Sequence, residues 1–336
     1  MKYPKFIKKN DKIAVTAPSL GFSKEEQIIE YDNAIKNIEN MGFRFIETEN
    51  VRTCENGRSS STEERAEQFM NVWNNDEVSA IICAKGGDFA CEVLDFLDFE
   101  RIKKSEPKWV QGFSDITNLG FLLTTNCDIA TIYGENIRDY GMKSLHKSLI
   151  DSIKIMQGEE ILQESFEFCE PINEEREIFE SYHLVQKACW KTLDNKPVHF
   201  SGRCVGGCFD VIINIIGTKY DKINEYIDKY KNDGIVWFFD IFEMSTPQIF
   251  CHLWQMKNAG YFENCNGIIF GRPFMVREDY DISLEMMVKE IFKEKDIPIV
   301  FDGDIGHIPP QMPIVNGGIL EVTCKNGKGT IKNFFR

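Results

Sequence analysis

The 336-residue sequence predicts an α/β protein with a parallel, doubly wound sheet in its first half and an α+β domain with a largely β core in its second half. Three observations lead to this fold class. Strand-like and helix-like patterns alternate up to about residue 156, the run 80–84 is apolar throughout, and a glutamate-rich stretch separates the two halves. Alternating elements are typical of parallel sheets, and a wholly apolar strand indicates burial on both faces.

The elements of the first half follow from apolar spacing and helix-start signals. Ser23 and Ser61 each precede a glutamate by three residues, which is the capping-box pattern at the start of a helix. The first of these helices is expected to end at Gly42. Strands are expected over 11–17, 43–47, 80–84, 109–113 and 129–133, and helices over 23–42, 61–73, 91–99, 116–125 and 143–156.

Residues 158–180 are rich in glutamate, have little apolar periodicity and contain Pro171, which favours a linker. We therefore expect a first domain over 1–160, a linker or crossover over 161–184 and a second domain over 185–336. In the second domain the clearest helices are 209–216 and 247–258. Strands are expected over 198–201, 234–240, 267–271, 297–301, 318–323 and 330–335.

Composition excludes several classes of function. A net charge of −14 argues against nucleic acid and anionic membrane surfaces as partners. The eleven cysteines contain no CxxC pair, so neither a zinc site nor a disulfide framework is expected. No apolar run approaches the roughly 18 residues of a membrane span, and the basic N-terminus lacks the apolar core of a secretory signal. We expect a cytoplasmic protein.

Ser114 lies where a strand-like run, 109–113, changes abruptly into a helix-like run. A serine at such a turn has its hydroxyl lifted out of the sheet, beside the first free N–H groups of the helix, which can stabilise an oxyanion. Taken alone, the segment is more typical of a serine that only caps a helix.

Gly86 and Gly87 follow the apolar strand 80–84 directly. Two glycines allow close approach of the backbone to a ligand, although a tight turn explains the pair as well. The sequence is far from a nucleotide-binding fingerprint, because no lysine followed by serine or threonine comes after it. If Ser114 is a nucleophile, one of these glycines becomes a second oxyanion donor at the same edge of the sheet.

A base and an acid are needed to activate a serine. Of five histidines, His307 stands apart because it occupies a loop rich in glycine and proline after a buried-looking strand. Asp240 ends a strongly apolar strand, where an ionised acid requires a partner, and Glu243 is the fallback acid.

These residues lie in motifs that resemble the LD-carboxypeptidase family of serine peptidases, which includes muropeptide LD-carboxypeptidases and microcin C immunity peptidases. The resemblance extends over nearly the whole chain. It rests on DKIAVTAPS from Asp11, AIICAKGGD from Ala80, GFSDIT from Gly112, FSGRCVGGC from Phe200, LWQMKNAGYF from Leu253, FGRP from Phe270 and DIGH from Asp304.

The resemblance implies a triad in which Ser114 is the nucleophile and His307 the general base, with the N–H groups of Asp115 and of Gly86 or Gly87 as the oxyanion hole. It further implies a Rossmann-like N-terminal domain, a β-rich C-terminal domain and a homodimer, without a metal or organic cofactor.

The chain departs from the family pattern at three places. Asp240 stands where the family has glutamate, Lys85 replaces the arginine of Arg-Gly-Gly, and Asp88 to Ala90 replace a tyrosine-and-glycine pattern. The last change resembles the microcin-immunity branch.

The function expected from these features is a metal-independent serine carboxypeptidase that cleaves a C-terminal amide in a muropeptide or related peptide. Arg203 is a candidate to hold the substrate carboxylate, or else a structural ion pair. One alternative substrate is an aminoacyl-nucleotide antibiotic, with Trp190 stacking on the base, although Trp190 is more typical of a core or lid residue. A different alternative is a non-catalytic relative that binds a peptide or nucleotide.

Overall fold

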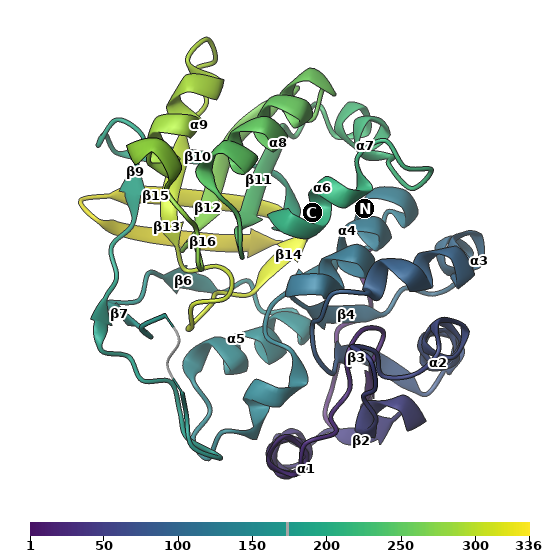
Figure 1. The fold of residues 1–336 in the computed structure, drawn as a ribbon. Helices are drawn as coiled ribbons and strands as arrows, with labels where there is room; N and C mark the ends of the chain where they lie inside the picture. Colours follow the sequence, from purple (N-terminus) through teal and green to yellow (C-terminus); the bar gives the residue numbers. More distant parts are fainter. Residues whose placement is uncertain (173–174) are drawn as a thin grey trace.

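The computed structural model describes residues 1–172 and 175–336. Two sheets form two lobes, drawn in purple to blue and in green to yellow in Figure 1, and helices cover them. The chain therefore has the α/β class that the sequence predicts, with a parallel sheet in the N-terminal lobe and a sheet-rich C-terminal lobe.

The first sheet has the strand order β14-β5-β4-β3-β1-β2. Its five N-terminal strands are parallel, and only β14 runs antiparallel to its neighbour β5. The strands are β1 (Lys12–Thr16), β2 (Arg44–Glu47), β3 (Val78–Cys83), β4 (Trp109–Gly112), β5 (Thr131–Tyr133) and β14 (Ile314–Asn316). The carboxyl ends of the parallel strands share one edge, and ligands of parallel sheets bind at that edge.

The helices of this lobe are α1 (Glu25–Asn40), α2 (Thr62–Asn74), α3 (Phe99–Lys104), α4 (Thr117–Cys127) and α5 (Lys147–Met156). Ser61 caps α2 as expected, by accepting a hydrogen bond from the Glu64 N–H. Ser23 does not cap α1, because that helix begins one residue later, after Lys24. The helix predicted over 91–99 is a 3₁₀ helix over Ala90–Phe96, followed by the separate helix α3.

The second sheet has the order β6-β16-β15-β10-β11-β12-β13-β9. Strands β10 to β13 are parallel, while β9, β15, β16 and β6 are antiparallel to their neighbours. The strands are β6 (Leu162–Glu164), β9 (Lys191–Thr192), β10 (Val198–Cys208), β11 (Ile235–Asp240), β12 (Cys265–Gly271), β13 (Ile299–Gly303), β15 (Ile319–Lys325) and β16 (Lys328–Phe334). The helices of this lobe are α6 (Phe209–Ile215), α7 (Ile223–Lys229), α8 (Thr246–Asn258) and α9 (Leu284–Phe292).

The linker predicted over 161–184 includes residues 173–174, which lie outside the described residues. On either side of them, β6 pairs with β16, and β7 (Phe168–Cys169) pairs with β8 (Gln186–Lys187). The division into domains over 1–160 and 185–336 stays a prediction. The return of β14 to the first sheet was not expected, because the sequence contains no signal for this long-range pairing.

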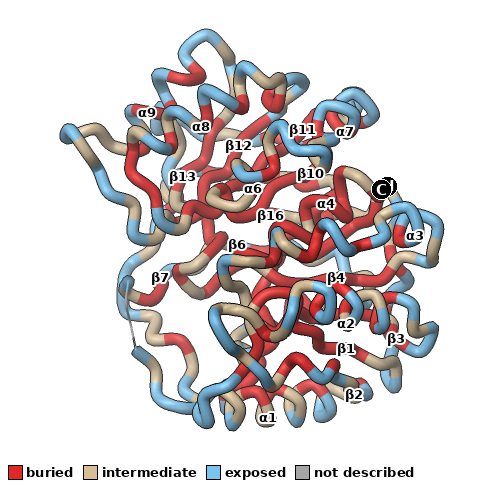
Figure 2. Tube along the Cα trace, turned by 45° about the vertical axis from the view of Figure 1, so that its right-hand side comes forward, coloured by how far each residue is buried: buried red, intermediate tan, exposed pale blue. Residues whose placement is uncertain are grey.

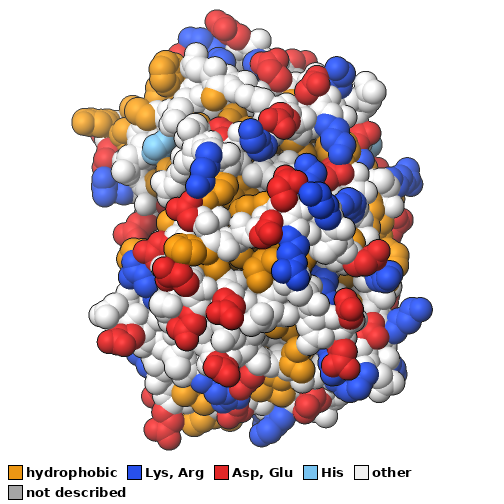
Figure 3. Space-filling view, turned by 90° about the vertical axis from the view of Figure 1, so that its right-hand side faces the viewer, with side chains coloured by type: hydrophobic (Ala, Val, Ile, Leu, Met, Phe, Trp, Pro, Cys, Tyr) orange, Lys and Arg blue, Asp and Glu red, His pale blue; other side chains and the backbone are white. Residues whose placement is uncertain are grey.

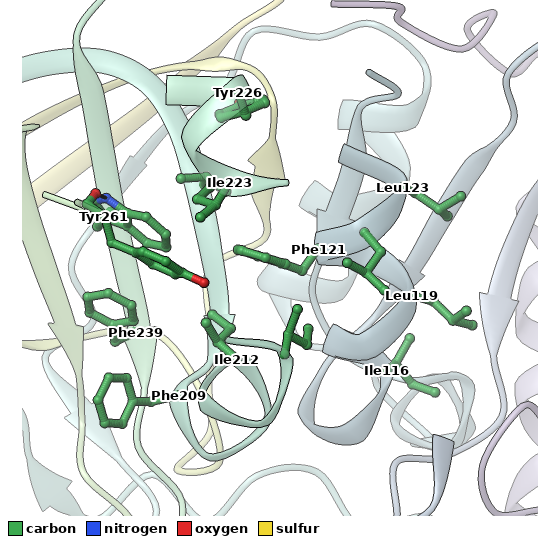
Figure 4. Packing of buried hydrophobic residues seen from close by; sticks show 14 of the residues in the cluster. Ile116, Leu119, Phe121, Leu123, Phe209, Ile212, Ile223, Tyr226, Phe239 and Tyr261 are labelled. Atoms are coloured by element: carbon green, nitrogen blue, oxygen red, sulfur yellow. Dashed lines mark hydrogen bonds between the residues drawn. The ribbon is translucent and has the colours of Figure 1, made fainter. Parts of the chain in front are cut away.

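The two lobes share one hydrophobic core. Figure 2 shows buried chain running through the strands of both sheets, with exposed chain on the outer helices. In Figure 4, Phe121 of α4 points toward Ile212 of α6 and Ile223 of α7, and its ring stacks on Trp237 of β11 with 6.3 Å between ring centroids. This contact holds the helix that follows Ser114 against the strand that ends at Asp240.

The surface carries both signs of charge. On the face seen in Figure 3, acidic and basic side chains are interspersed over the whole surface. In the described parts of the chain, no helix combines the length and apolar character needed to cross a membrane.

Replacing Phe121 by alanine should lower the free energy of unfolding by about 3–5 kcal/mol, because a fully buried ring at the contact between the lobes is lost. Urea unfolding measures the effect. Trp254→Ala is the matched control: this side chain is 56% exposed, so its loss should change stability far less. Equal losses in both variants would contradict the proposed importance of the contact.

Candidate active site

Ser114 occupies a sharp turn directly after β4. Phe113 is extended, Ser114 itself has φ +62°, and a 3₁₀ turn over Ser114–Ile116 leads into α4. Positive φ is uncommon for a residue with a side chain, and such strain is concentrated at functional sites. The turn aims the half-buried hydroxyl out of the sheet edge, as the sequence predicts, rather than using it as a cap: no side-chain capping bond forms at this helix start.

The structure brings Ser114, His307 and Asp240 together from three distant parts of the chain. A hydrogen bond of 3.0 Å joins the His307 Nε2 and the Ser114 Oγ. On the other side of the ring, the His307 Nδ1 lies 2.8 Å from the Asp240 Oδ2. The side chain of Asp240 is completely buried, whereas His307 keeps a small exposed fraction.

The His307–Asp240 contact is short but imperfectly aligned. The two atoms are within hydrogen-bond distance, but the angle at Nδ1 is too far from linear for a hydrogen bond. Among the described residues, Nδ1 has no other hydrogen-bond partner. Hydrogen bonds between catalytic groups are often poorly aligned before a ligand is bound.

Gly306 allows the loop carrying His307 to pass the buried acid. It has φ +96°, and a Cβ at this position would lie 2.0 Å from the Asp240 Oδ1. Any side chain would therefore displace the carboxylate from the histidine.

Gly86 packs against the nucleophile turn in the same way. A Cβ on Gly86 would lie 2.9 Å from the Ser114 Cβ and 3.6 Å from the Asp115 backbone nitrogen. The N–H groups of Gly86, Gly87 and Asp115 have no hydrogen-bond acceptor within the described ranges, and all three residues line the same cavity. Unpaired amides around a serine hydroxyl are the groups an oxyanion needs.

The carboxylate of Asp115 fastens this turn to two neighbouring loops. Its Oδ2 accepts hydrogen bonds from the Ser19 hydroxyl at 2.5 Å and from the Ala90 N–H at 2.8 Å, while the Asn118 amide donates to its Oδ1. Burial raises the pKa of Asp115 above its ordinary value, and these donors oppose the shift. Sequence reasoning used only the backbone of Asp115 and missed this clamp.

A cavity of about 500 Å³ opens beside Ser114. Phe113 and Phe242 flank the imidazole of His307, with ring centroids 5.1 and 4.4 Å from it. Both phenylalanines line the cavity together with Lys85, Asp88, Asn118, Asn136, Arg138 and Asp210.

Lys85 lines this cavity and carries a positive charge. Among the described residues, no carboxylate lies within ion-pair distance of its ammonium. Its ammonium donates a hydrogen bond to the Gln27 side chain at 3.5 Å. Burial, helped by the nearby charge of Arg138, lowers the pKa of Lys85. Arg138, in contrast, is paired with Glu30 at 2.6 Å.

Three candidates from the sequence are not brought to this cavity. Glu243 is exposed, and its N–H donates to the Asp210 carboxylate, so Asp240 rather than Glu243 meets the histidine. Arg203 lies inside the long strand β10 rather than in a turn. Its guanidinium binds the Asp233 carboxylate at 2.6 Å and the carbonyls of Gly317 and Arg336.

Trp190 is also remote from the cavity. It is 1% exposed in the core of the second lobe, and its indole N–H donates to the Asp304 Oδ2 at 2.9 Å. Each residue thus follows the alternative that the sequence left open. Arg203 forms a structural ion pair, and Trp190 occupies a core position. No group of three or more histidine, cysteine or acidic side chains in the described ranges is arranged to hold a metal ion.

Tyr133 is a site residue that sequence reasoning missed. It ends β5, the neighbour of β4, and its hydroxyl donates to the Asp240 Oδ2 at 2.5 Å. The only signal in the sequence is its position at the end of a predicted strand, where a polar atom reaches the functional edge of the sheet.

Glu135 lies behind the cavity, next to Asn136 in its wall. Its Oε1 accepts a hydrogen bond from the Tyr182 hydroxyl at 3.3 Å, and the side chain is fully buried. Burial, followed by repulsion from Asp139, raises the pKa of Glu135 well above its ordinary value.

Comparisons with known proteins cover both halves of the chain. A family model described as the LD-carboxypeptidase N-terminal domain matches residues 13–134, and one described as the LD-carboxypeptidase C-terminal domain matches residues 201–322.

Among curated proteins, a probable murein peptide carboxypeptidase of Bacillus subtilis (strain 168) is 24% identical, covering 94% of this chain and 89% of the relative. The microcin C7 self-immunity protein MccF of Escherichia coli is also 24% identical, covering 86% and 84%.

Solved structures share the fold over the full length. An MccF-like protein from Bacillus anthracis str. Ames superposes with a TM-score of 0.82 at 20% identity, covering 100% of both chains. MccF in complex with glutamyl sulfamoyl guanosine superposes with a TM-score of 0.79 at 20% identity, covering 99% of this chain and 98% of that one.

Glu135→Gln should make stability less dependent on pH. Because the folded protein raises the pKa of Glu135, the folded state holds a proton that the unfolded chain releases above about pH 4.3. The wild-type protein therefore loses stability as pH rises from that value towards the folded-state pKa, by up to about 1.4 kcal/mol per pH unit.

Urea unfolding between pH 5 and 8 measures the free energy of unfolding of both proteins. The value for Glu135→Gln minus the value for the wild type should grow as the pH rises. Glu106→Gln, which changes an exposed side chain, is the control. A difference that stays constant over this range would contradict a protonated Glu135.

Proposed function

The chain belongs to the LD-carboxypeptidase family, and on that premise we propose that it is a metal-independent serine carboxypeptidase acting through Ser114, His307 and Asp240. The observation that carries the proposal is the line of contacts from the Ser114 Oγ through the His307 ring to the Asp240 carboxylate. A serine hydroxyl is a weak nucleophile unless a base takes its proton, and a base needs a third group to fix its tautomer.

In the proposed reaction, the Ser114 Oγ attacks the carbonyl carbon of the scissile amide while the His307 Nε2 takes the hydroxyl proton. Asp240 accepts the Nδ1–H, so that Nε2 is the free base, and its charge stabilises the imidazolium that forms. The carbonyl oxygen becomes an oxyanion, for which the amides of Asp115 and of Gly86 or Gly87 are the donors. His307 then protonates the leaving amine, and water hydrolyses the acyl-enzyme by the reverse sequence.

The leaving group of a carboxypeptidase carries a carboxylate, and we propose Lys85 as the cation that receives it. Arg203 is fully engaged elsewhere, whereas Lys85 lines the cavity without an acidic partner in the described chain. A half-buried ammonium without a counter-charge gains most from an anionic ligand, because it has already lost part of its hydration.

The second candidate substrate is an aminoacyl-nucleotide, as in the complex of MccF with glutamyl sulfamoyl guanosine. The favouring observation is the pair of aromatic rings, Phe113 and Phe242, in the cavity wall. Aromatic faces can stack on a nucleobase, a contact worth about 1–3 kcal/mol. The homodimer and the cytoplasmic location remain proposals implied by the family.

Ser114→Ala should reduce turnover by about 10⁴- to 10⁶-fold, because the nucleophile is lost while the backbone of the turn remains. The assay offers a muropeptide tetrapeptide and an aminoacyl sulfamoyl adenylate side by side, which also identifies the substrate class. Ser201→Ala, at an exposed serine on β10, is the control. Full activity of Ser114→Ala would overturn the mechanism, and failure of a fluorophosphonate to label wild-type Ser114 would favour a non-catalytic binding protein.

Lys85→Met should raise KM for the cleaved substrate by about 10- to 100-fold with little change in kcat, because a charge-assisted hydrogen bond of about 1.5–3 kcal/mol is lost. Steady-state kinetics measure the two constants separately. Lys24→Met removes a nearby exposed lysine that does not line the cavity and should leave both constants unchanged. An unaltered KM in Lys85→Met would exclude the assigned role.

A further inference from the structure

Tyr133 is buried where the two lobes meet. It is the last residue of β5, where it pairs with Gly112 of β4 on one side and with Ile314 of β14 on the other. Its ring packs against Phe238 of β11, with 5.2 Å between centroids. The side chain is 2% exposed and does not line the cavity beside Ser114.

The hydroxyl of Tyr133 contacts two parts of the proposed machinery at once. It donates a hydrogen bond to the Asp240 Oδ2 at 2.5 Å, and it lies 3.4 Å from the Ser114 backbone N–H, which donates to it. The first contact reaches the end of β11 in one lobe, and the second reaches the nucleophile turn in the other. Burial and the neighbouring Asp240 charge raise the pKa of Tyr133 well above its ordinary value, so the hydroxyl keeps the proton that it donates.

We propose that Tyr133 is a positioning residue of the reaction, whose hydroxyl holds the Asp240 carboxylate and the Ser114 turn in a fixed relation. The inference rests on the proposed function, since it assigns a role in the same serine chemistry.

The need for such a residue follows from the surroundings of Asp240. Its Oδ1 has no hydrogen-bond partner in the described part of the chain and faces Gly306. The Oδ2 faces both the His307 Nδ1 and the Tyr133 hydroxyl. The well-formed hydrogen bond to the carboxylate therefore comes from Tyr133, because the contact with His307 is poorly aligned. Without it, the carboxylate would have no well-aligned hydrogen bond within the described part of the chain.

The Ser114 turn depends on the same hydroxyl. A backbone with φ +62° places the Ser114 N–H where the Tyr133 oxygen is its acceptor, and a strained conformation persists only where the surroundings stabilise it. Loss of the hydroxyl should therefore disturb the acid and the nucleophile together, while the cavity that binds the substrate stays unchanged.

The test is Tyr133→Phe, which removes one oxygen and keeps the ring, with a fluorophosphonate as the probe of serine reactivity. The dependence of the labelling rate on probe concentration separates the maximal rate of bond formation from the apparent affinity for the probe. We expect the maximal rate to fall by about tenfold or more and the affinity to stay within about twofold, because only the reacting groups are misplaced.

Tyr226→Phe is the matched control. Tyr226 is equally buried, and its hydroxyl donates a hydrogen bond to the Cys204 carbonyl at 3.2 Å, but it lies outside the site. This variant should label at the wild-type rate. Urea unfolding of both variants measures the loss of stability, which should be larger for Tyr133→Phe because two hydrogen bonds are lost, one of them to a carboxylate.

Wild-type labelling by Tyr133→Phe would overturn the proposal, and so would an equal loss of rate in Tyr226→Phe. A Tyr133→Phe protein that does not fold would also overturn it, because the hydroxyl would then serve folding rather than positioning. If the wild-type protein itself is not labelled at Ser114, the proposed function fails, and the role of Tyr133 fails with it. The outcomes for the two proposals are thus distinguishable.

Discussion

The candidate site depends on the packing of the two lobes through one hydrophobic core. Ser114 begins the turn that leads into α4, whereas Asp240 ends β11 and His307 follows β13 in the other lobe. The contact between Phe121 of α4 and Trp237 of β11 is one of those that hold the nucleophile turn against the lobe that carries the acid and the histidine. Close-packed interiors tolerate little sliding, so a separation of 3.0 Å between side chains 193 residues apart can be maintained.

The second constraint is the burial of charge at Asp240. A carboxylate with no exposed surface is costly unless donors surround it, and here the donors are the groups that a serine nucleophile requires. The Asp240 Oδ2 faces both His307 and Tyr133, while Gly306 is packed so closely against the Oδ1 that a side chain at that position would not fit. The loop that carries Gly306 thus brings the His307 Nδ1 to 2.8 Å from the Asp240 carboxylate.

Local patterns predicted most of the elements because their causes are local. The alternation of strands and helices up to α5 is confirmed, as are the ends of β4 and β11 that carry Ser114 and Asp240. The helix expected over 91–99 was wrong in form, because its residues form a 3₁₀ helix whose first turn is tied to the Asp115 carboxylate through Ala90. The antiparallel return of β14 to the first sheet depends on a partner about 180 residues away in sequence, which no local pattern contains.

By itself the sequence determined the fold class, the family, and the residue types of a nucleophile, an acid and a base, because apolar periodicity and short motifs are properties of neighbouring residues. Only the tertiary structure decided which polar residues meet. Asp240 rather than Glu243 reaches His307. Arg203 and Trp190 instead make hydrogen bonds to Asp233 and Asp304 in the second lobe. Tyr133 joins the acid to the nucleophile turn. These contacts depend on how two sheets pack against each other, and the direction of a side chain across such an interface is set by packing rather than by local sequence.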